Sequence, residues 1–227
     1  MEITASLVKE LREKTGVGLM DCKKALTHSE GNFDNAIKYL REKGLANASK
    51  KAERSTNEGK IFIATNEKKA TILELNCETD FVAKNTDFIT LGNKIASDIL
   101  NNEIQDNDIE KINKEEISNH ILKLGENITI KQFQTTHTNN ELASYIHSNG
   151  KIGVIVTFSN TIDLEIGKNI AMHIAATNPI YIKPEDVKKD DIKNEKEIIQ
   201  KQSQSEGKPD NVIEKIIEGR LNKFYKE

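Results

Sequence analysis

The stretch from residue 73 to residue 84 constrains the fold more than any other part of the chain. It begins with strict alternation of apolar and polar residues: Leu73, Glu74, Leu75, Asn76, Cys77 and Glu78. A period of two is typical of a half-buried strand. The alternation stops at Thr79 and Asp80, which are good helix N-caps because a side-chain oxygen accepts a free amide of the first turn. The next apolar residues have helical spacing: Phe81, Val82, Phe88, Leu91, Ile95 and Ile99. We predict a strand that turns directly into a helix, Thr79 to Leu100, with Phe81 on the corner.

The role of Phe81 has two interpretations. Most phenylalanines are core residues, so its ring could pack the new helix onto the sheet. Alternatively, Asp80 and Phe81 could protrude together and offer a carboxylate and a ring to a partner. The sequence pattern alone leaves both open.

A resemblance to a known family rests on several long segments. TDFVAK after a strand and the opening ITASLVKELREKTGVGLMDCKKAL resemble the elongation factor Ts family. Further similar segments are spread over the chain: GENITIK (125–131), HSNGKIGV (147–154), AMHIAA (171–176), IKPEDV (182–187) and EGRLNKF (218–224). The family exchanges guanine nucleotide on elongation factor Tu in bacterial and organellar translation.

The resemblance implies a function without covalent chemistry, so we expect no enzyme, no cofactor and no metal bound by this chain alone. It implies that Tu, the partner, carries the nucleotide and the metal. The residues expected to enter Tu near its Mg²⁺ and displace the ion are Thr79, Asp80, Phe81 and Val82. The residues expected to contact Tu elsewhere are Lys9, Arg12, Leu19, Met20, Ala83, Lys84 and His147.

Composition excludes several other classes of protein. Charged residues make up 30% of the chain and the net charge is −3, whereas a dedicated nucleic-acid binder is usually basic. There is no apolar run of about 18 residues that would span a membrane. The N-terminus has no apolar signal-peptide core, so a cytoplasmic protein is expected. Cys22 and Cys77 are predicted to be buried free thiols, and no Cys or His pair has zinc-ligand spacing.

The predicted fold class is α+β, in four segments. Residues 1–54 form three short helices, the third closed by Gly44, and the resemblance implies a ubiquitin-associated-like bundle. Residues 55–140 and 141–179 form two similar strand–strand–helix core units, with polar residues 101–108 as a loop in the first. Residues 180–227 form a projecting antiparallel helical hairpin, a coiled coil whose first helix starts at Pro184. In some family members this arm makes a homodimer contact.

Two local features stay open at this point. Val17, Leu19 and Met20 surround a glycine-rich turn and either plug the bundle or contact a partner; the resemblance favours contact for Leu19 and Met20. The family continues beyond the position of Glu227, so we expect the second unit to lack strands and to expose a sheet edge.

Two other function classes compete with nucleotide exchange. The basic group Lys50, Lys51 and Arg54 would suit an RNA-binding translation protein, whose affinity for tRNA would fall steeply with salt. An adaptor acting only through the helical module would keep all its binding when truncated to residues 1–54.

Overall fold

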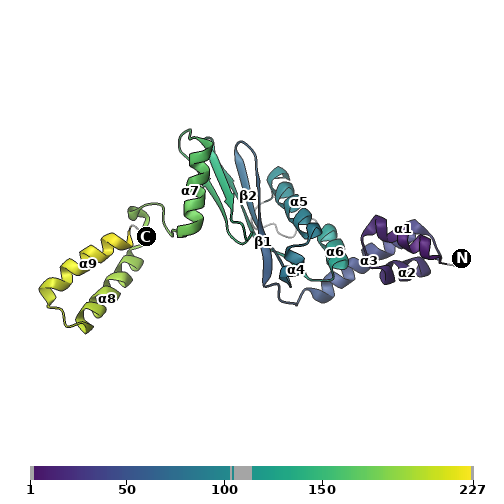
Figure 1. Ribbon diagram of the computed structural model, residues 1–227, viewed down its shortest axis with the longest axis horizontal. Coiled ribbons are helices and arrows are strands. Elements are labelled where there is room, and N and C mark those ends of the chain that lie inside the picture. The colour runs from purple at the N-terminus through teal and green to yellow at the C-terminus, as the bar shows by residue number, and fades with distance from the viewer. Residues whose placement is uncertain (1–2, 103, 105–113, 226–227) are drawn as a thin grey trace. The chain divides into compact units, whose positions relative to one another are not determined.

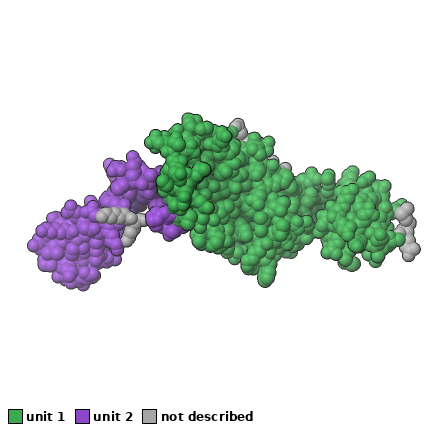
Figure 2. Space-filling view, turned by 45° about the horizontal axis from the view of Figure 1, so that its top comes forward, with its two compact units in different colours: residues 1–172 green, residues 173–227 purple. Residues whose placement is uncertain are grey.

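The computed structural model describes residues 3–102, 104 and 114–225. The chain divides into two compact units, residues 1–172 and residues 173–227 (Figure 2). The four-segment division drawn from the sequence stays a prediction, and its third segment, 141–179, crosses the boundary between these units. In the part of the chain that is described, no helix combines the length and apolar character needed to cross a membrane.

The first unit begins with the three predicted helices, α1 (Ala5–Thr15), α2 (Leu19–His28) and α3 (Phe33–Lys51) (Figure 1). Thr4 caps α1 as expected, with Oγ1 accepting a hydrogen bond from the Leu7 amide. The three helices enclose a core of their own, built around Leu11, Cys22 and Leu26. The bundle therefore has the apolar centre that its sequence pattern predicted.

The prediction that Gly44 ends the third helix is wrong. Helix α3 continues past it to Lys51 and buries Gly44 against α6 (Lys114–Leu124). A Cβ atom at this position would lie 3.3 Å from the backbone oxygen of Ser118. The glycine is explained by the close approach of two helices rather than by a left-handed helix end.

The centre of the first unit is an antiparallel sheet of β1 (Glu58–Thr65), β2 (Lys69–Cys77) and β3 (Ile128–His137), in the order β1-β2-β3. Helices α4 (Asp80–Ala83) and α5 (Thr86–Asn102) cover one face of it (Figure 1). The core between them contains Phe62, Leu73 and Phe88. Gly92 of α5 rests directly on the Phe62 ring, so a side chain there would push the helix off the sheet.

The helix predicted to run unbroken from Thr79 to Leu100 is in fact two helices. The four-residue α4 ends at Ala83, with Lys84 as its C-cap. The side chain of Asn85 then starts α5 by accepting a hydrogen bond from the Asp87 amide at 2.8 Å. Helix α5 then extends through Asn102, so the predicted loop 101–108 begins as helix. Most of the remainder of that loop lies outside the described residues.

The other face of the central sheet carries a two-stranded sheet, β4 (Leu142–Ile146) and β5 (Gly153–Thr157) (Figure 1). Gly153 allows β5 to lie against Ile61 and Ile63 of β1. Helix α7 (Leu164–Thr177) packs on β4 through Gly167, beside Ala143. Within the described residues each of these two strands has one neighbour in its sheet.

The second unit contains α8 (Lys189–Ser205) and α9 (Asp210–Phe224), which reverse direction at Gly207–Pro209. Their buried seam is formed by Ile199, Ser203, Ile213 and Leu221. The predicted helix pair is therefore present, but its first helix does not begin at Pro184. Pro184 opens a short 3-10 helix, η2 (Pro184–Asp186), and α8 starts after Lys188.

Candidate functional site: the strand–helix corner

The corner between β2 and α4 presents one large ring to solvent. The Phe81 side chain is 81% exposed, so the interpretation of Phe81 as a core residue is wrong for the free protein. The next two residues, Val82 and Ala83, are buried in the core beneath α4. Both were expected to contact the partner directly, but their side chains are buried in the free protein. They fix the short helix on the sheet and leave the ring of Phe81 outside.

Thr79 and Asp80 begin α4 as the sequence predicted. Thr79 is the N-cap, and its Oγ1 accepts a hydrogen bond from the Val82 amide at 3.4 Å. Asp80 is half exposed and forms an ion pair with Lys84, one helical turn later, at 2.6 Å. The hydrogen bond from Lys84 lowers the pKa of Asp80, with a smaller contribution from the charge of Lys151. The carboxylate beside Phe81 is therefore ionised and held by a lysine that is itself on the surface.

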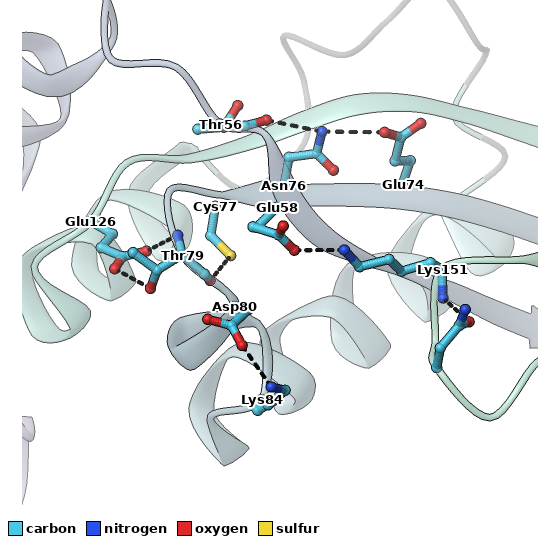
Figure 3. A network of polar contacts seen from close by, with 11 residues as sticks. Thr56, Glu58, Glu74, Asn76, Cys77, Thr79, Asp80, Lys84, Glu126 and Lys151 are labelled. Carbon is cyan, nitrogen blue, oxygen red and sulfur yellow. Dashed lines mark hydrogen bonds and ion pairs between the residues drawn. The ribbon is translucent and has the colours of Figure 1, made fainter.

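A carboxylate clamp, formed by Glu78, Thr79, Glu126 and Asn127, joins the end of β2 to the start of β3. Figure 3 shows two of its members, Thr79 and Glu126. Glu126 Oε2 accepts hydrogen bonds from the amides of Glu78 at 3.1 Å and Thr79 at 2.9 Å. Its Oε1 accepts a third from the Thr79 hydroxyl at 2.6 Å. In return, Glu78 Oε1 accepts a hydrogen bond from the Asn127 amide at 2.7 Å.

Sequence reasoning did not identify Glu126 as a functional residue. The GENITIK segment that carries part of the family resemblance contains it, and its position just before a predicted strand was the available signal. What the sequence did not indicate is that the start of this strand lies beside the end of β2. The register of the sheet, which pairs Cys77 with Ile128, brings them together.

The end of α3 is tied to the same place. Arg54 Nη1 lies 3.4 Å from Glu78 Oε1, and the backbone oxygen of Arg54 accepts a hydrogen bond from the Asn127 side chain at 3.0 Å. The Lys51 ammonium donates to the backbone oxygen of Gly125. Two of the three residues considered as a basic RNA-binding group therefore make contacts within the protein.

The turn between β4 and β5 reaches the same end of the central sheet. The Ile61 amide donates to the backbone oxygen of Gly150 at 2.8 Å, and Lys151 forms an ion pair with Glu58 at 2.7 Å. Because Glu58 pairs with Cys77 in the sheet, this turn and the corner lie near one another (Figure 3). His147 is exposed on the turn, with Nδ1 3.2 Å from the Tyr145 hydroxyl. The structure thus brings two of the predicted contact regions together.

The third predicted contact region is separate and belongs to the helical module. Leu19 is 48% exposed and Met20 is 66% exposed, whereas Val17 is buried at 4%. Of the three apolar residues at the glycine-rich turn, one therefore plugs the bundle and two remain on its surface. Lys9 and Arg12 are exposed on the neighbouring helix α1. The apolar core of the helical module is distinct from the core of the central sheet that lies under Phe81. Helix α6 contributes Leu122 to the core of the module and Ile121 to the core of the sheet.

Both cysteines are buried free thiols, as predicted. Burial raises the pKa of the Cys77 thiol to about 11, and the thiol donates a hydrogen bond to the backbone oxygen of Thr79 at 3.2 Å. Among the described side chains, no group of three or more His, Cys, Asp or Glu residues could hold a metal ion.

Comparison with known protein families gives a match over most of the described chain. The family model described as elongation factor TS matches residues 78–227 and begins at the first residue of the carboxylate clamp. The match spans about two thirds of the chain and contains the corner, the turn with His147 and the helix pair. Taken with the exposed Phe81 at a corner fixed from below, it shows that the chain belongs to the elongation factor Ts family.

Proposed function

We propose that this chain is a guanine-nucleotide exchange factor that binds Tu in its GDP-bound form, disturbs the partner's Mg²⁺ and speeds GDP release. Family membership implies a general role in nucleotide exchange on Tu during translation elongation, and binding to Tu. The mechanism at the corner is the proposal. The observation that carries it is the exposure of Phe81 beside an ionised Asp80 on a helix whose other residues are buried or capped.

The ring of Phe81 supplies the apolar contact. Leaving most of a phenylalanine in water costs roughly 2 kcal/mol relative to burial, so a partner pocket that covers it gains that free energy on binding. In the proposed complex the ring separates elements of Tu that pack near its Mg²⁺. Val82 and Ala83, which are buried, take no direct part; they hold α4 in place under the ring.

Asp80 supplies the charge. Mg²⁺ demands near-ideal octahedral oxygen geometry and keeps several waters, so a new carboxylate beside it disturbs its water ligands. In the free chain Lys84 forms an ion pair with Asp80. When Tu binds, this ion pair must either break or move together with the Asp80 carboxylate. Loss of the ion weakens the binding of the GDP phosphates to Tu, and GDP then dissociates. Thr79 keeps Asp80 at the first position of α4 by capping the helix.

Two further surfaces grip Tu in this proposal. One is on the helical module, where Leu19 and Met20 expose apolar side chains at the start of α2 and Lys9 and Arg12 are exposed on α1. The turn with His147 forms the other contact, near the corner. Contact of two copies through the helix pair α8–α9 is a separate proposal, which sedimentation of the chain alone would test.

The test is the release of fluorescent GDP from Tu in the presence of Mg²⁺. We expect the release rate to rise with the concentration of this chain and then to saturate. Exchange is a coupling between two ligands of Tu, so GDP with Mg²⁺ must weaken Tu's affinity for this chain by the same factor by which the chain weakens GDP binding. A release rate that stays at the level of Tu alone, or a complex equally tight with and without GDP, would contradict the proposal.

A further inference from the structure

We propose that Glu126 is the positioning residue of the corner: it fixes the direction of α4, and so presents Phe81 to the partner already ordered. This inference rests on the proposed exchange function and names a residue that acts through Phe81 without touching the partner itself.

The short helix α4 needs such support. A helix of four residues has no stability of its own, because forming a single turn fixes several backbone angles for very few hydrogen bonds. Its exposed member, Phe81, contributes little packing. Besides the Asp80–Lys84 ion pair on its surface, α4 is held by the burial of Val82 and Ala83 on one side and by the cap at Thr79 on the other.

Glu126 controls that cap. The Thr79 hydroxyl donates to Glu126 Oε1 at 2.6 Å and accepts from the Val82 amide, so the carboxylate fixes the rotamer in which Thr79 caps the helix. The two amides bonded to Oε2 belong to Glu78 and Thr79, the last residues before the helix. Hydrogen bonds to a carboxylate are among the stronger ones in proteins, and three here converge on one side chain.

The clamp also continues the sheet where the strands stop. The ladder between β2 and β3 ends with Cys77 opposite Ile128. One step further, Glu78 and Asn127 no longer pair as strands. Instead, the Glu126 carboxylate accepts a hydrogen bond from the Glu78 amide, and the Glu78 carboxylate accepts one from the Asn127 amide. The chain is therefore held across the gap at the point where it leaves the sheet for α4. A strand end without this link would be free to change the direction of Phe81.

The first experiment uses the free chain and needs no partner. Backbone ¹⁵N relaxation of the wild type is expected to give order parameters of roughly 0.85 from Thr79 to Lys84, and Glu126→Ala is expected to lower them to below about 0.6. Glu74→Ala is the matched control, since Glu74 also joins β2 to β3, through Gln132 at 2.9 Å, but does not bond to the corner. The control should leave these order parameters unchanged. An equally rigid corner in Glu126→Ala would overturn the inference.

The second experiment separates positioning from general stability. With saturating chain, Glu126→Ala should reduce the maximal rate of GDP release about tenfold, while the concentration for half-maximal rate changes by less than about threefold, since the module surface is untouched. When Phe81 is already alanine, Glu126→Ala should slow release no further, because residues that act as one unit are not additive. An equal loss in both backgrounds would show that Glu126 only supports the fold.

Glu126→Gln keeps the shape and one acceptor oxygen, and it serves if the alanine variant does not fold. Compared with Glu126→Ala, it should restore part of the backbone order at the corner and part of the rate of GDP release. A glutamine variant that has a rigid corner but releases GDP as slowly as Phe81→Ala would contradict the positioning role. Failure of the exchange proposal looks different. In that case the wild type itself would not speed GDP release, while the relaxation measurement on the free chain would still decide the role of Glu126.

Discussion

Replacing Phe81 with alanine separates a partner contact from a structural role. About a fifth of the side chain is buried, on the order of 40 Å² of a ring side chain of ~200 Å². At ~25 cal/mol per Å² this burial contributes only ~1 kcal/mol to folding. The free energy of unfolding, measured by urea denaturation of the chain alone, should therefore fall by no more than about 1 kcal/mol. The rate of GDP release from Tu should fall at least about tenfold, which corresponds to ~1.4 kcal/mol of lost transition-state stabilisation.

Two control variants give this measurement its scale. Phe88→Ala removes a fully buried ring from the same region and should cost roughly 3–5 kcal/mol of unfolding free energy. Ile182→Ala removes an apolar side chain that is 98% exposed in the second unit, and should alter neither quantity. A loss of stability in Phe81→Ala close to that of Phe88→Ala, with an unchanged release rate per folded molecule, would refute the reasoning.

Three further predictions concern other parts of the molecule. Met20→Ala should weaken binding to Tu about tenfold, seen mainly as faster dissociation, with little change in stability. Val17→Ala, at the same turn, should instead lower the free energy of unfolding by roughly 1–3 kcal/mol and leave binding by the folded chain nearly unchanged. Because the bond from Lys84 lowers the pKa of Asp80, Lys84→Met should raise that pKa towards the ordinary value of an aspartate, which an NMR titration of Asp80 would detect; no upward shift would mean that the ion pair is absent in solution. Burial raises the pKa of Cys77 to about 11, so a thiol reagent at pH 8 should label it only when the chain unfolds; rapid labelling of folded protein would show that the corner opens.

Local signals in the sequence predicted most elements of the fold. The alternation before Thr79 and the helical spacing after it placed the corner at the right residues, because both periods follow directly from backbone geometry. The same local rules failed at Gly44. A glycine late in a helical pattern looks like a helix end, whereas here it is explained by contact with Ser118, far away in the sequence.

The candidate site was predictable only in part. Val17, Leu19 and Met20 are all apolar, and which of them is buried depends on how three helices pack, which no local pattern contains. The sequence pattern left the exposure of Phe81 open for the same reason, and only the family resemblance favoured an exposed ring. The support from Glu126 was missed because it depends on the β2–β3 register, which joins segments about 50 residues apart.

That separation in sequence has a consequence for how the protein is made. The bonds of the clamp join residues 47 to 49 positions apart. At about 5–20 residues per second, a ribosome needs roughly 2–10 s to go from the first half of the clamp to the second. During that interval the β1–β2 hairpin has already left the ribosomal active centre, yet Glu126 has not been added to the chain. A nascent chain therefore cannot present Phe81 in its finished orientation, and this surface of the protein is completed only after β3 has been synthesised and paired.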